Sequence, residues 1–345
     1  MPDEKWINDN GGIKGGPLKV ITCNEKNDAA EAEKCAQQAV AEKVVAVVGS
    51  YSLAGDRFMP ILQKAGIPYI GGTGVSAAEF SNPLSFPVNG GTPVVFAAHG
   101  RQLVEEGCEK ISGVRYDVAA AAIVSKFLTL GVTSAGGAPP KDLKVPVTAT
   151  DLAPQVAAAT KGSDCVSVIL GTHSDLFVTS YVQSGAKTKL GSVVGNLTPE
   201  LAESTGGAGS PLEGSAITGY YPPVSDAAWK DFVEATKGKD IDITSGANAT
   251  AWVAFKVFTE AAKKLPTISA EALVQELNTT SGIDTGGLTP ALNWKTSTAL
   301  PIKGLNRIHN TTATELTIRD GKIEWAESGS TFVDVRKVLT AKPAG

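Results

Sequence analysis

The sequence lacks an excess of positive charge and any long apolar run. Its 31 Lys and Arg residues are outnumbered by 35 Asp and Glu, which gives a net charge of −4. A general nucleic-acid binder needs a basic face to displace counterions, so we expect no nucleic-acid partner. No apolar stretch approaches the roughly 20 residues of a membrane-spanning helix. The polar segment at residues 1–6 does not resemble a signal peptide.

Recognisable catalytic and metal-binding motifs are also missing. The sequence contains no Walker A, HExxH or G-x-S-x-G pattern, and its three histidines, His99, His173 and His309, are scattered. The run from Gly72 to Ala77 matches G-x-G-x-x-A. A dinucleotide site would need a long helix next and an acid about 20 residues later, and Pro83 interrupts that helix. We therefore expect no cofactor, no metal and no catalytic residues.

The four cysteines form no CxxC pair, which excludes a zinc ribbon and a thioredoxin motif. Cys23 ends a short predicted strand and Cys35 lies on the following helix, whereas Cys108 and Cys165 each precede an apolar strand. This placement favours disulfides Cys23–Cys35 and Cys108–Cys165, which would indicate an oxidising, extracytoplasmic compartment. Buried free thiols are the alternative interpretation.

The chain alternates apolar strands with amphipathic helices, which is typical of parallel α/β sheets. Two such series predict two α/β lobes, and Asp320-Gly321 predicts a hairpin between 314–318 and 322–325. Strands are expected at 18–21, 44–49, 67–70, 110–115, 166–171, 190–195 and 215–221. Helices are expected at 28–43 with Asn27 as cap, 55–65, from Thr92-Pro93 to Gly107, 118–130 ending at Gly131, 152–161, from Ser174 to Gly185, 226–236, 247–264 and 269–278.

Small polar residues follow several of these strands. Because ligands bind beyond the carboxyl ends of parallel strands, these loops predict a binding site with hydroxyls and open backbone N–H groups, suited to an anionic ligand group. The candidates are Tyr51, Ser52, Thr73, Gly74, Ser76, Thr172, His173 and Asn196. Tyr221, where the chain is expected to pass from one lobe to the other, is a further candidate. The alternatives are an ordinary glycine-rich turn, a solvent-facing His173 and core packing of Tyr221. Asp117 and Asp175 could converge as an acid pair, but an Asp at a helix start is more often a cap.

Several segments together resemble branched-chain-amino-acid-type substrate-binding proteins, the type I periplasmic-binding-fold receptors of ABC importers. The segments are Ile7 to Leu18, Cys23…Asn27-Asp28…Cys35, Val45 to Ser50, Gly66 to Ile70, Thr150 to Val156, Gly219 to Pro223 and Leu292 to Trp294. The resemblance implies two Rossmann-like lobes with parallel central sheets, joined by a three-strand hinge that closes on a small ligand. It places residues 1–107 and 224–284 in lobe I, and 108–223 and 285–345 in lobe II.

The resemblance also implies a function. We expect a non-enzymatic, monomeric, extracytoplasmic receptor, in the periplasm or lipid-anchored at the cell surface, that delivers a small ligand to the membrane subunits of an ABC importer. Loops at Tyr51-Ser52 and Gly74–Ser76 would bind a carboxylate, and Tyr116 would cover the ligand. A ligand-sensing regulator of the same fold is the alternative, and an enzyme is a third class.

Two departures from the family pattern affect these expectations. Amino-acid-binding members carry an acid where this sequence has Asn196, so an uncharged amide, a carboxylic acid or an aromatic acid suits the site as well as an amino acid. Family members also begin with an apolar strand before their first helix, whereas residues 7–18 already match the end of that helix. We therefore expect either that the chain is a truncated form or that lobe I fills the place of this strand in another way.

Overall fold

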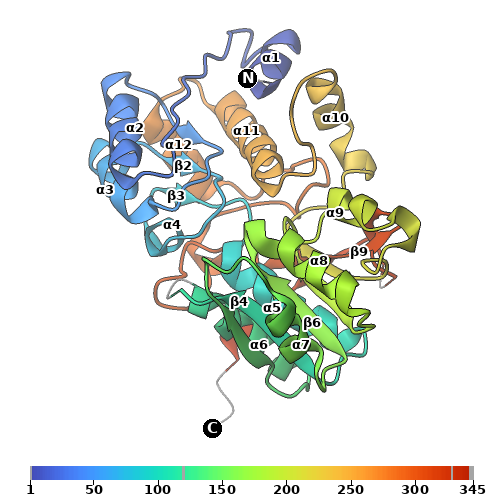
Figure 1. Cartoon of the computed structure of the whole chain (residues 1–345). Helices are drawn as coiled ribbons and strands as arrows, with labels where there is room; N and C mark the ends of the chain where they lie inside the picture. The colour runs from blue at the N-terminus through green and yellow to red at the C-terminus, as the bar shows by residue number, and fades with distance from the viewer. Residues whose placement is uncertain (1, 119–120, 328, 342–345) are drawn as a thin grey trace. The chain divides into compact units, whose positions relative to one another are not determined.

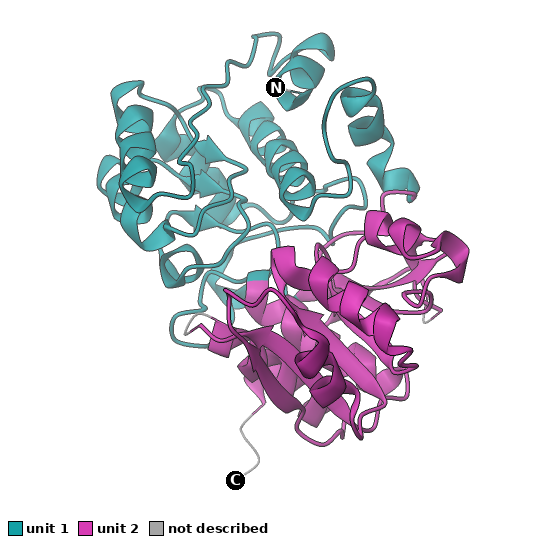
Figure 2. Cartoon of the chain, in the orientation of Figure 1, with its two compact units in different colours: residues 1–91, 226–311 teal, residues 92–225, 312–345 magenta. Residues whose placement is uncertain are grey.

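The computed structural model describes residues 2–118, 121–327 and 329–341, and the chain forms two compact units (Figure 2). Unit 1 comprises Met1–Gly91 and Asp226–Thr311, and unit 2 comprises Thr92–Ser225 and Thr312–Gly345, so the chain passes between them three times. The expected two-lobed α/β fold is confirmed. The lobe boundaries differ, because residues 92–107 belong to unit 2 and residues 285–311 to unit 1.

Contacts explain both boundary changes. The indole nitrogen of Trp294 donates to the carbonyl of Pro87, and the Nε of Arg307 donates to the carbonyl of Ser85, which ties residues 285–311 to unit 1. Helix α5 (Gly91–Glu105) instead packs closely on α6 (Ala122–Ser134) of unit 2.

Unit 1 contains a three-stranded parallel sheet in the order β1-β2-β3, of which β2 and β3 are labelled in Figure 1. Its strands are β1 (Val47–Val48), β2 (Tyr69–Ile70) and β3 (Ser85–Phe86). Its helices are α1 (Pro2–Asp9), α2 (Ala29–Ala41), α3 (Gly55–Ala65), α4 (Ala77–Ser81), α10 (Lys230–Thr236), α11 (Gly246–Lys264) and α12 (Ala270–Thr279). The predicted strand at 18–21 is wrong, since this segment joins no sheet among the described residues.

Local sequence explains where the helices of unit 1 begin and end. The carboxylate of Asp28 accepts from the amides of Ala30 and Glu31, so Asp28 caps α2. The expected cap, Asn27, is wrong because that residue adopts a left-handed φ of 57° just before the helix. The end of α3 at Gly66 is confirmed, with a left-handed φ of 71° that glycine adopts without strain.

Unit 2 is built on an eight-stranded sheet, in which β10-β9-β8-β7-β6-β4-β5 form the path and β11 pairs with β9. The strands β4 to β8 are parallel, and the hairpin of β9 and β10 around Asp320-Gly321 is confirmed. The strands are β4 (Ile111–Tyr116), β5 (Lys141–Val145), β6 (Cys165–Ile169), β7 (Lys189–Val193), β8 (Ala216–Gly219), β9 (Thr312–Arg319), β10 (Lys322–Trp325) and β11 (Phe332–Asp334). The remaining α-helices are α6, α7 (Ala153–Thr160), α8 (Ser174–Ser184), α9 (Pro199–Ser204) and α13 (Arg336–Thr340).

Close helix packing explains why α6 runs past its predicted end at Gly131. A Cβ at Gly131 would lie 2.0 Å from the carbonyl oxygen of Ala97, and one at Gly100 would lie 2.3 Å from that of Leu128. Both glycines therefore let α5 and α6 approach each other backbone to backbone. Gly131 serves helix packing here rather than helix termination.

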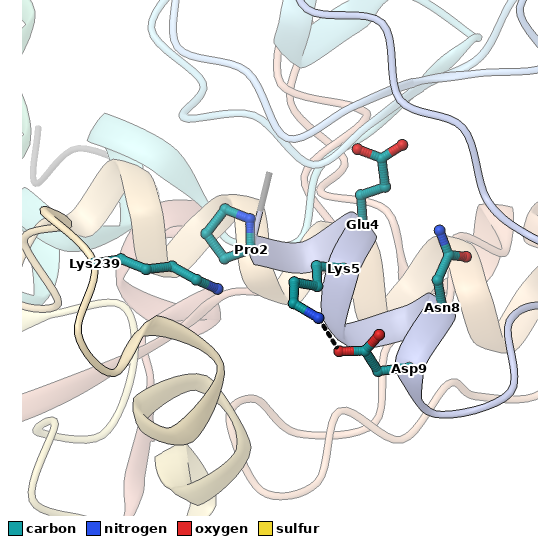
Figure 3. Close-up of a pocket in the computed structure, with 6 residues that line it drawn as sticks. All are labelled: Pro2, Glu4, Lys5, Asn8, Asp9 and Lys239. Atoms are coloured by element: carbon teal, nitrogen blue, oxygen red, sulfur yellow. Dashed lines mark hydrogen bonds and ion pairs between the residues drawn. The ribbon is translucent and has the colours of Figure 1, made fainter.

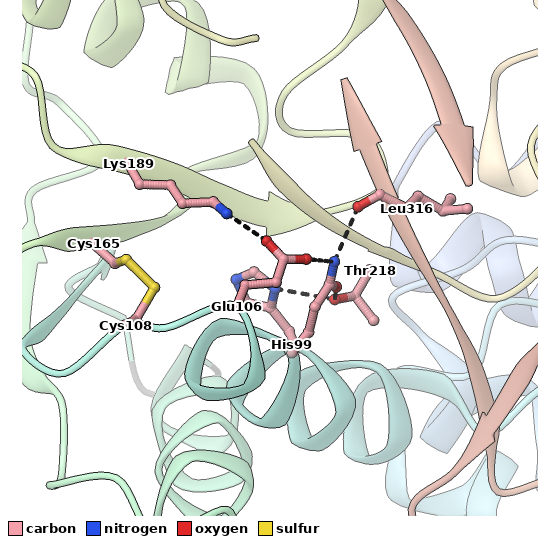
Figure 4. Close-up of polar contacts among 8 residues, drawn as sticks. His99, Glu106, Cys108, Cys165, Lys189, Thr218 and Leu316 are labelled. Carbon is pink, nitrogen blue, oxygen red and sulfur yellow. Dashed lines mark hydrogen bonds and ion pairs between the residues drawn. A yellow bond between two sulfur atoms is a disulfide. The ribbon is translucent and has the colours of Figure 1, made fainter. Parts of the chain in front are cut away.

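A buried polar network joins α5 to the sheet of unit 2 (Figure 4). The imidazole of His99 lies 3.1 Å from the hydroxyl of Thr218. It lies equally far from the hydroxyl of Ser167, and burial lowers its pKa to about 3. One turn further on, the side-chain amide of Gln102 donates to the carbonyl of Leu316. His99 therefore remains neutral and supports the structure.

Both expected disulfides are present, which excludes the free-thiol interpretation. Cys23–Cys35 attaches the chain before α2 to that helix, and Cys108–Cys165 joins the segment before β4 to the start of β6 (Figure 4). Their sequence separations are 12 and 57 residues. The longer loop removes more entropy from the unfolded chain.

Replacing each cysteine pair by serine is expected to lower the free energy of unfolding. The chain-entropy relation gives about 4 kcal/mol for Cys108–Cys165 and about 3 kcal/mol for Cys23–Cys35. Urea unfolding of the two double variants measures both losses. A larger loss for the Cys23–Cys35 pair would contradict an entropic origin of the difference.

The depressed pKa of His99 makes stability fall in acid. In the unfolded chain His99 binds a proton below about pH 6.5, whereas in the folded protein it binds one only below about pH 3. Between pH 7.5 and 5 this difference costs about 2 kcal/mol. His99→Gln keeps hydrogen-bonding capacity without titrating. Urea unfolding at both pH values should show that the variant loses about 2 kcal/mol less than wild type, and equal losses would refute the role given to His99.

Candidate functional site

The strand-end loops of unit 1 are joined through the main chain. The amide of Thr73 donates to the carbonyl of Ser50 across 2.9 Å, which links the loop after β2 to the loop after β1. Tyr51 projects from the first loop with half of its surface exposed. The structure thus brings the predicted residues Tyr51, Ser52, Thr73, Gly74 and Ser76 into two adjoining loops.

Glycines make the turn after β2 compact. A Cβ at Gly72 would lie 2.3 Å from the hydroxyl of Tyr69, and one at Gly74 would lie 2.6 Å from the ring of Phe80. Gly72 also has a left-handed φ of +85°. Beside this turn, the hydroxyl oxygen of Thr73 is buried and has no hydrogen-bond partner within the described part of the chain. The Thr73 hydroxyl is therefore available, within the described chain, for a hydrogen bond to a ligand.

The hydroxyls of the two serine candidates accept hydrogen bonds within their own loops. The hydroxyl of Ser52 accepts from the amide of Ala54, and the hydroxyl of Ser76 caps α4 by accepting from the amide of Glu79. Ser52 and Ser76 are both buried. Their hydroxyls stabilise the loop conformations through these bonds. Direct contact of Ser52 or Ser76 with a ligand stays a prediction.

Glu79 organises this turn and was not among the sequence candidates. Its Oε2 accepts from the amides of both Val75 and Ser76, and the hydroxyl of Tyr69 donates to its Oε1. Burial raises the pKa of the Glu79 carboxyl. The pattern Ser76-x-x-Glu79 is a capping-box signal that could have identified it. Several backbone N–H groups expected to be open in this loop are consequently engaged inside the protein.

Unit 2 offers an aromatic pair at the ends of β4 and β6. The rings of Tyr116 and His173 lie 5.5 Å apart, edge to face. The Nδ1 of His173 is buried without a hydrogen-bond partner in the described ranges, whereas Thr172 beside it is exposed. Three of the predicted residues, Tyr116, Thr172 and His173, thus lie together.

The two remaining candidates, Asn196 and Tyr221, make hydrogen bonds within the protein. The side-chain oxygen of Asn196 accepts from the amide of Gly171, and its nitrogen donates to the carbonyl of Val193, so Asn196 joins the loops after β6 and β7. Tyr221 is 6% exposed, and its carbonyl accepts from the hydroxyl of Thr314. A ligand contact of Asn196 or Tyr221 stays a prediction.

The two aspartates considered as an acid pair are each engaged by a neighbouring group. Asp117 pairs with Lys144 at 3.4 Å, and Asp175 accepts from the amide of Leu176 in the first turn of α8. Each carboxylate therefore has a local partner. Cys108, Asp164 and Cys165 could also be taken for a metal site, but both sulfurs are consumed by the disulfide.

A hollow beside α1 contains none of the predicted residues (Figure 3). Pro2, Glu4, Lys5, Asn8, Asp9 and Lys239 line it. Lys5 and Asp9 form an exposed ion pair across one helical turn, which is worth little in water. The hollow is therefore a solvated helix surface. Separately, among the described residues no helix is both long and apolar enough to cross a membrane.

Comparisons with known proteins bear on the family and the fold of the chain. The model of the periplasmic binding protein family matches residues 5–303. No curated protein sequence matches the chain. A leucine-binding protein of Thermotoga maritima has a similar structure, with TM-score 0.75 and 19% identity over 96% of this chain and 92% of that one.

Two further solved structures contain ligands. A branched-chain amino acid transporter substrate-binding protein of Streptococcus pneumoniae, in complex with isoleucine, gives TM-score 0.74 and 20% identity over 96% of this chain and 93% of that one. An ABC transporter solute-binding protein of R. palustris, in complex with 4-hydroxybenzoate, gives TM-score 0.74 and 18% identity over 97% of this chain and 91% of that one. At these identities the likeness shows the fold.

Glu79→Gln is expected to destabilise unit 1 by about 1–3 kcal/mol, because its NH2 group must replace either Oε2, which accepts from the amides of Val75 and Ser76, or Oε1, which accepts from the hydroxyl of Tyr69. The loss should be smaller at pH 7 than at pH 4. Burial raises the pKa of Glu79 in the folded protein above its value near 4.5 in the unfolded chain. Wild type therefore loses stability as the pH rises past 4.5, whereas glutamine does not titrate.

Urea unfolding at both pH values tests this, with Glu105→Gln as the matched control. Glu105 is exposed in an ion pair with Arg101, so its replacement should change stability by less than about 0.5 kcal/mol. A loss for Glu79→Gln that grows toward pH 7 would contradict the account.

Proposed function

The chain belongs to the periplasmic binding protein family, and on that premise we propose that it is an extracytoplasmic receptor that closes on a small ligand and delivers it to an ABC importer. The family binds solutes and does not catalyse reactions. Two disulfides support an oxidising compartment, because they persist poorly in reducing cytosol. The proposed receptor works as a monomer, with importer membrane subunits as its protein partners.

The observation that supports this most directly is the pair of unused polar atoms in the strand-end loops. The hydroxyl of Thr73 in unit 1 and the Nδ1 of His173 in unit 2 are both buried without a partner in the described chain. A buried polar group without a hydrogen bond is costly. A polar ligand atom placed at either group would supply the missing hydrogen bond and recover that cost.

The neighbouring side chains favour a ligand with an apolar or aromatic body. Tyr51 and Val75 are exposed in unit 1, and Val118 is exposed close to Tyr116 in the sequence of unit 2. The half-buried rings of Tyr116 and His173, packed edge to face, add an aromatic surface on which an apolar or aromatic group can pack. We therefore propose a carboxylic or aromatic acid, or an amide, as the ligand class.

A plain α-amino acid fits less well. Its ammonium would need a counter-charge, and at the position where the resemblance places an acid this chain has the neutral Asn196. The Asn196 side chain is also engaged with the amide of Gly171 and the carbonyl of Val193. An uncharged or anionic group avoids the cost of burying an unpaired ammonium.

A thermal-shift panel tests the function and the ligand class together. 4-Hydroxybenzoate, benzoate, isoleucine, leucine and short aliphatic amides serve as probes. An acid or amide should raise Tm with rising concentration, because it binds only the folded protein. If no probe raises Tm at millimolar concentration, the proposed ligand class is wrong.

Substitutions then locate the site. Tyr116→Ala and His173→Ala should each weaken the best probe at least about tenfold, since each removes a ring contact worth about 1.4 kcal/mol. Val182→Ala, at an exposed position of α8, is the matched control and should bind as wild type does. Calorimetric titration measures the three affinities. Unchanged binding by both ring variants would place the ligand elsewhere.

A further inference from the structure

The imidazole of His99 lies across three neighbouring strands of the unit 2 sheet. Gly191 of β7 pairs with Ser167 of β6 and with Ala216 of β8, and Thr218 lies two residues beyond Ala216 on the same face of the sheet. The Nε2 of His99 lies 3.1 Å from the hydroxyl of Ser167. Its Nδ1 lies 3.1 Å from the hydroxyl of Thr218 (Figure 4). One side chain of α5 therefore connects β6 to β8 over the strand between them, and we call these two contacts the imidazole bridge.

The glycine in β7 leaves room for this ring. A Cβ at Gly191 would lie 3.1 Å from the Cε1 of His99, the ring carbon between the two nitrogens. It would also lie 2.9 Å from the Cδ2 of Leu103, which is fully buried one turn further along α5. Glycine weakens the interior of a strand and often marks the close approach of another group. In β7 that group is the face of α5 that carries His99 and Leu103.

The hydrogen bonds around the ring determine which nitrogen carries the hydrogen. The side-chain nitrogen of Gln102 donates to the carbonyl of Leu316, so its oxygen Oε1 is the acceptor for the hydroxyl of Thr218. A hydroxyl has one hydrogen to donate, so Thr218 accepts from His99 and the Nδ1 is protonated. The Nε2 of the neutral ring then accepts from the hydroxyl of Ser167. Each bond of the imidazole bridge therefore has a fixed direction.

The bridged strands lead into the loops that are proposed to bind the solute. The chain runs from β6 to Thr172 and His173, and from β7 to Asn196. The carbonyl of Thr218 accepts from the amide of Val194, just beyond the end of β7. Because these loops begin where the strands end, a change in the separation of β6 and β8 would displace the side chains proposed to contact the solute.

We propose, on the basis of the proposed function, that His99 is a positioning residue of the solute site. The imidazole bridge, with its hydrogen on Nδ1 and Gly191 beneath the ring, holds β6 and β8 at a fixed separation. Main-chain pairing joins only adjacent strands, whereas this bridge joins two strands that are not adjacent. A binding site keeps its geometry when the side chains behind the contacting residues are themselves locked. His99 therefore acts on the solute through the loops that follow the bridged strands.

Nitrogen NMR of the whole chain, labelled in its histidine rings, observes the bridge directly. His99 should show a protonated Nδ1 and an unprotonated Nε2. The sequence contains three histidines, and the signals that are lost in His99→Gln identify those of His99. A ring protonated at Nε2 would reverse both bonds of the imidazole bridge and would overturn the proposal.

Two serine variants separate the bridge from the loss of any buried hydroxyl. Ser167→Ala removes the hydroxyl that bonds to the ring, whereas Ser112→Ala removes an equally buried hydroxyl of β4 that bonds to Ser163. Ser167→Ala should speed hydrogen exchange at the amides of His173 and Val194 about tenfold, through local opening of the loops. Ser112→Ala should leave exchange at both amides unchanged. Equal acceleration by the two variants would contradict a positioning role.

Binding of 4-hydroxybenzoate connects the bridge to the solute site. His99→Leu removes both bonds of the bridge and should weaken this probe about tenfold, because the loops lose their fixed positions. His99→Gln has a carboxamide that can donate and accept as the ring does, and should bind the probe within about threefold of wild type. Calorimetric titration measures the three affinities, at a temperature where circular dichroism shows that every variant is folded.

Different results would refute the positioning role and the proposed function. If wild type binds 4-hydroxybenzoate and His99→Leu binds it equally well, the positioning role is wrong and the function stands. If wild type binds no probe acid or amide, the function fails, and hydrogen exchange in the two serine variants still decides whether His99 positions the loops. If His99→Leu does not fold, Ser167→Ala takes its place in the titration, with Ser112→Ala as its control.

Discussion

Parallel strand pairing is the constraint on which the proposed site depends. In unit 2 the pairing of β4 with β6 and of β6 with β7 brings their carboxyl ends to one edge, so Tyr116, His173 and Asn196 lie on neighbouring loops although they are far apart in the sequence. In unit 1 the pairing of β1 with β2 does the same for Tyr51 and Thr73. The loops can therefore be short and polar without losing their positions.

Most polar side chains that we describe in these loops make hydrogen bonds within the protein. Ser76 and Glu79 cap α4, and Asn196 connects two loops of unit 2. In these loops, the hydroxyl of Thr73 and the Nδ1 of His173 are buried side-chain atoms with no hydrogen-bond partner within the described chain. A binding site of this kind recognises its ligand with few polar contacts on a preorganised scaffold, which limits the entropy lost on binding.

Much of the fold follows from local sequence signals, and the exceptions have physical causes. Gly66 and Gly185 end α3 and α8 as predicted, because left-handed helix ends favour glycine. Gly131 does not end α6, since its lack of a side chain serves contact with α5, and that contact depends on residues far away in the sequence. Residues 18–21 have a strand pattern, but no strand among the described residues pairs with them. The loops could be located from strand ends, whereas the role of Glu79 depends on burial that a single sequence shows only weakly.

The central claim is that the protein carries a small molecule and releases it unchanged. Native mass spectrometry of freshly purified protein tests this most directly. The account predicts a species heavier than the chain by one small acid or amide, which returns to the mass of the disulfide-bonded chain after denaturation and recovers its partner when the compound is added back. A protein that shows only its own mass, and gains none of the probe acids or amides at millimolar concentration, would contradict it.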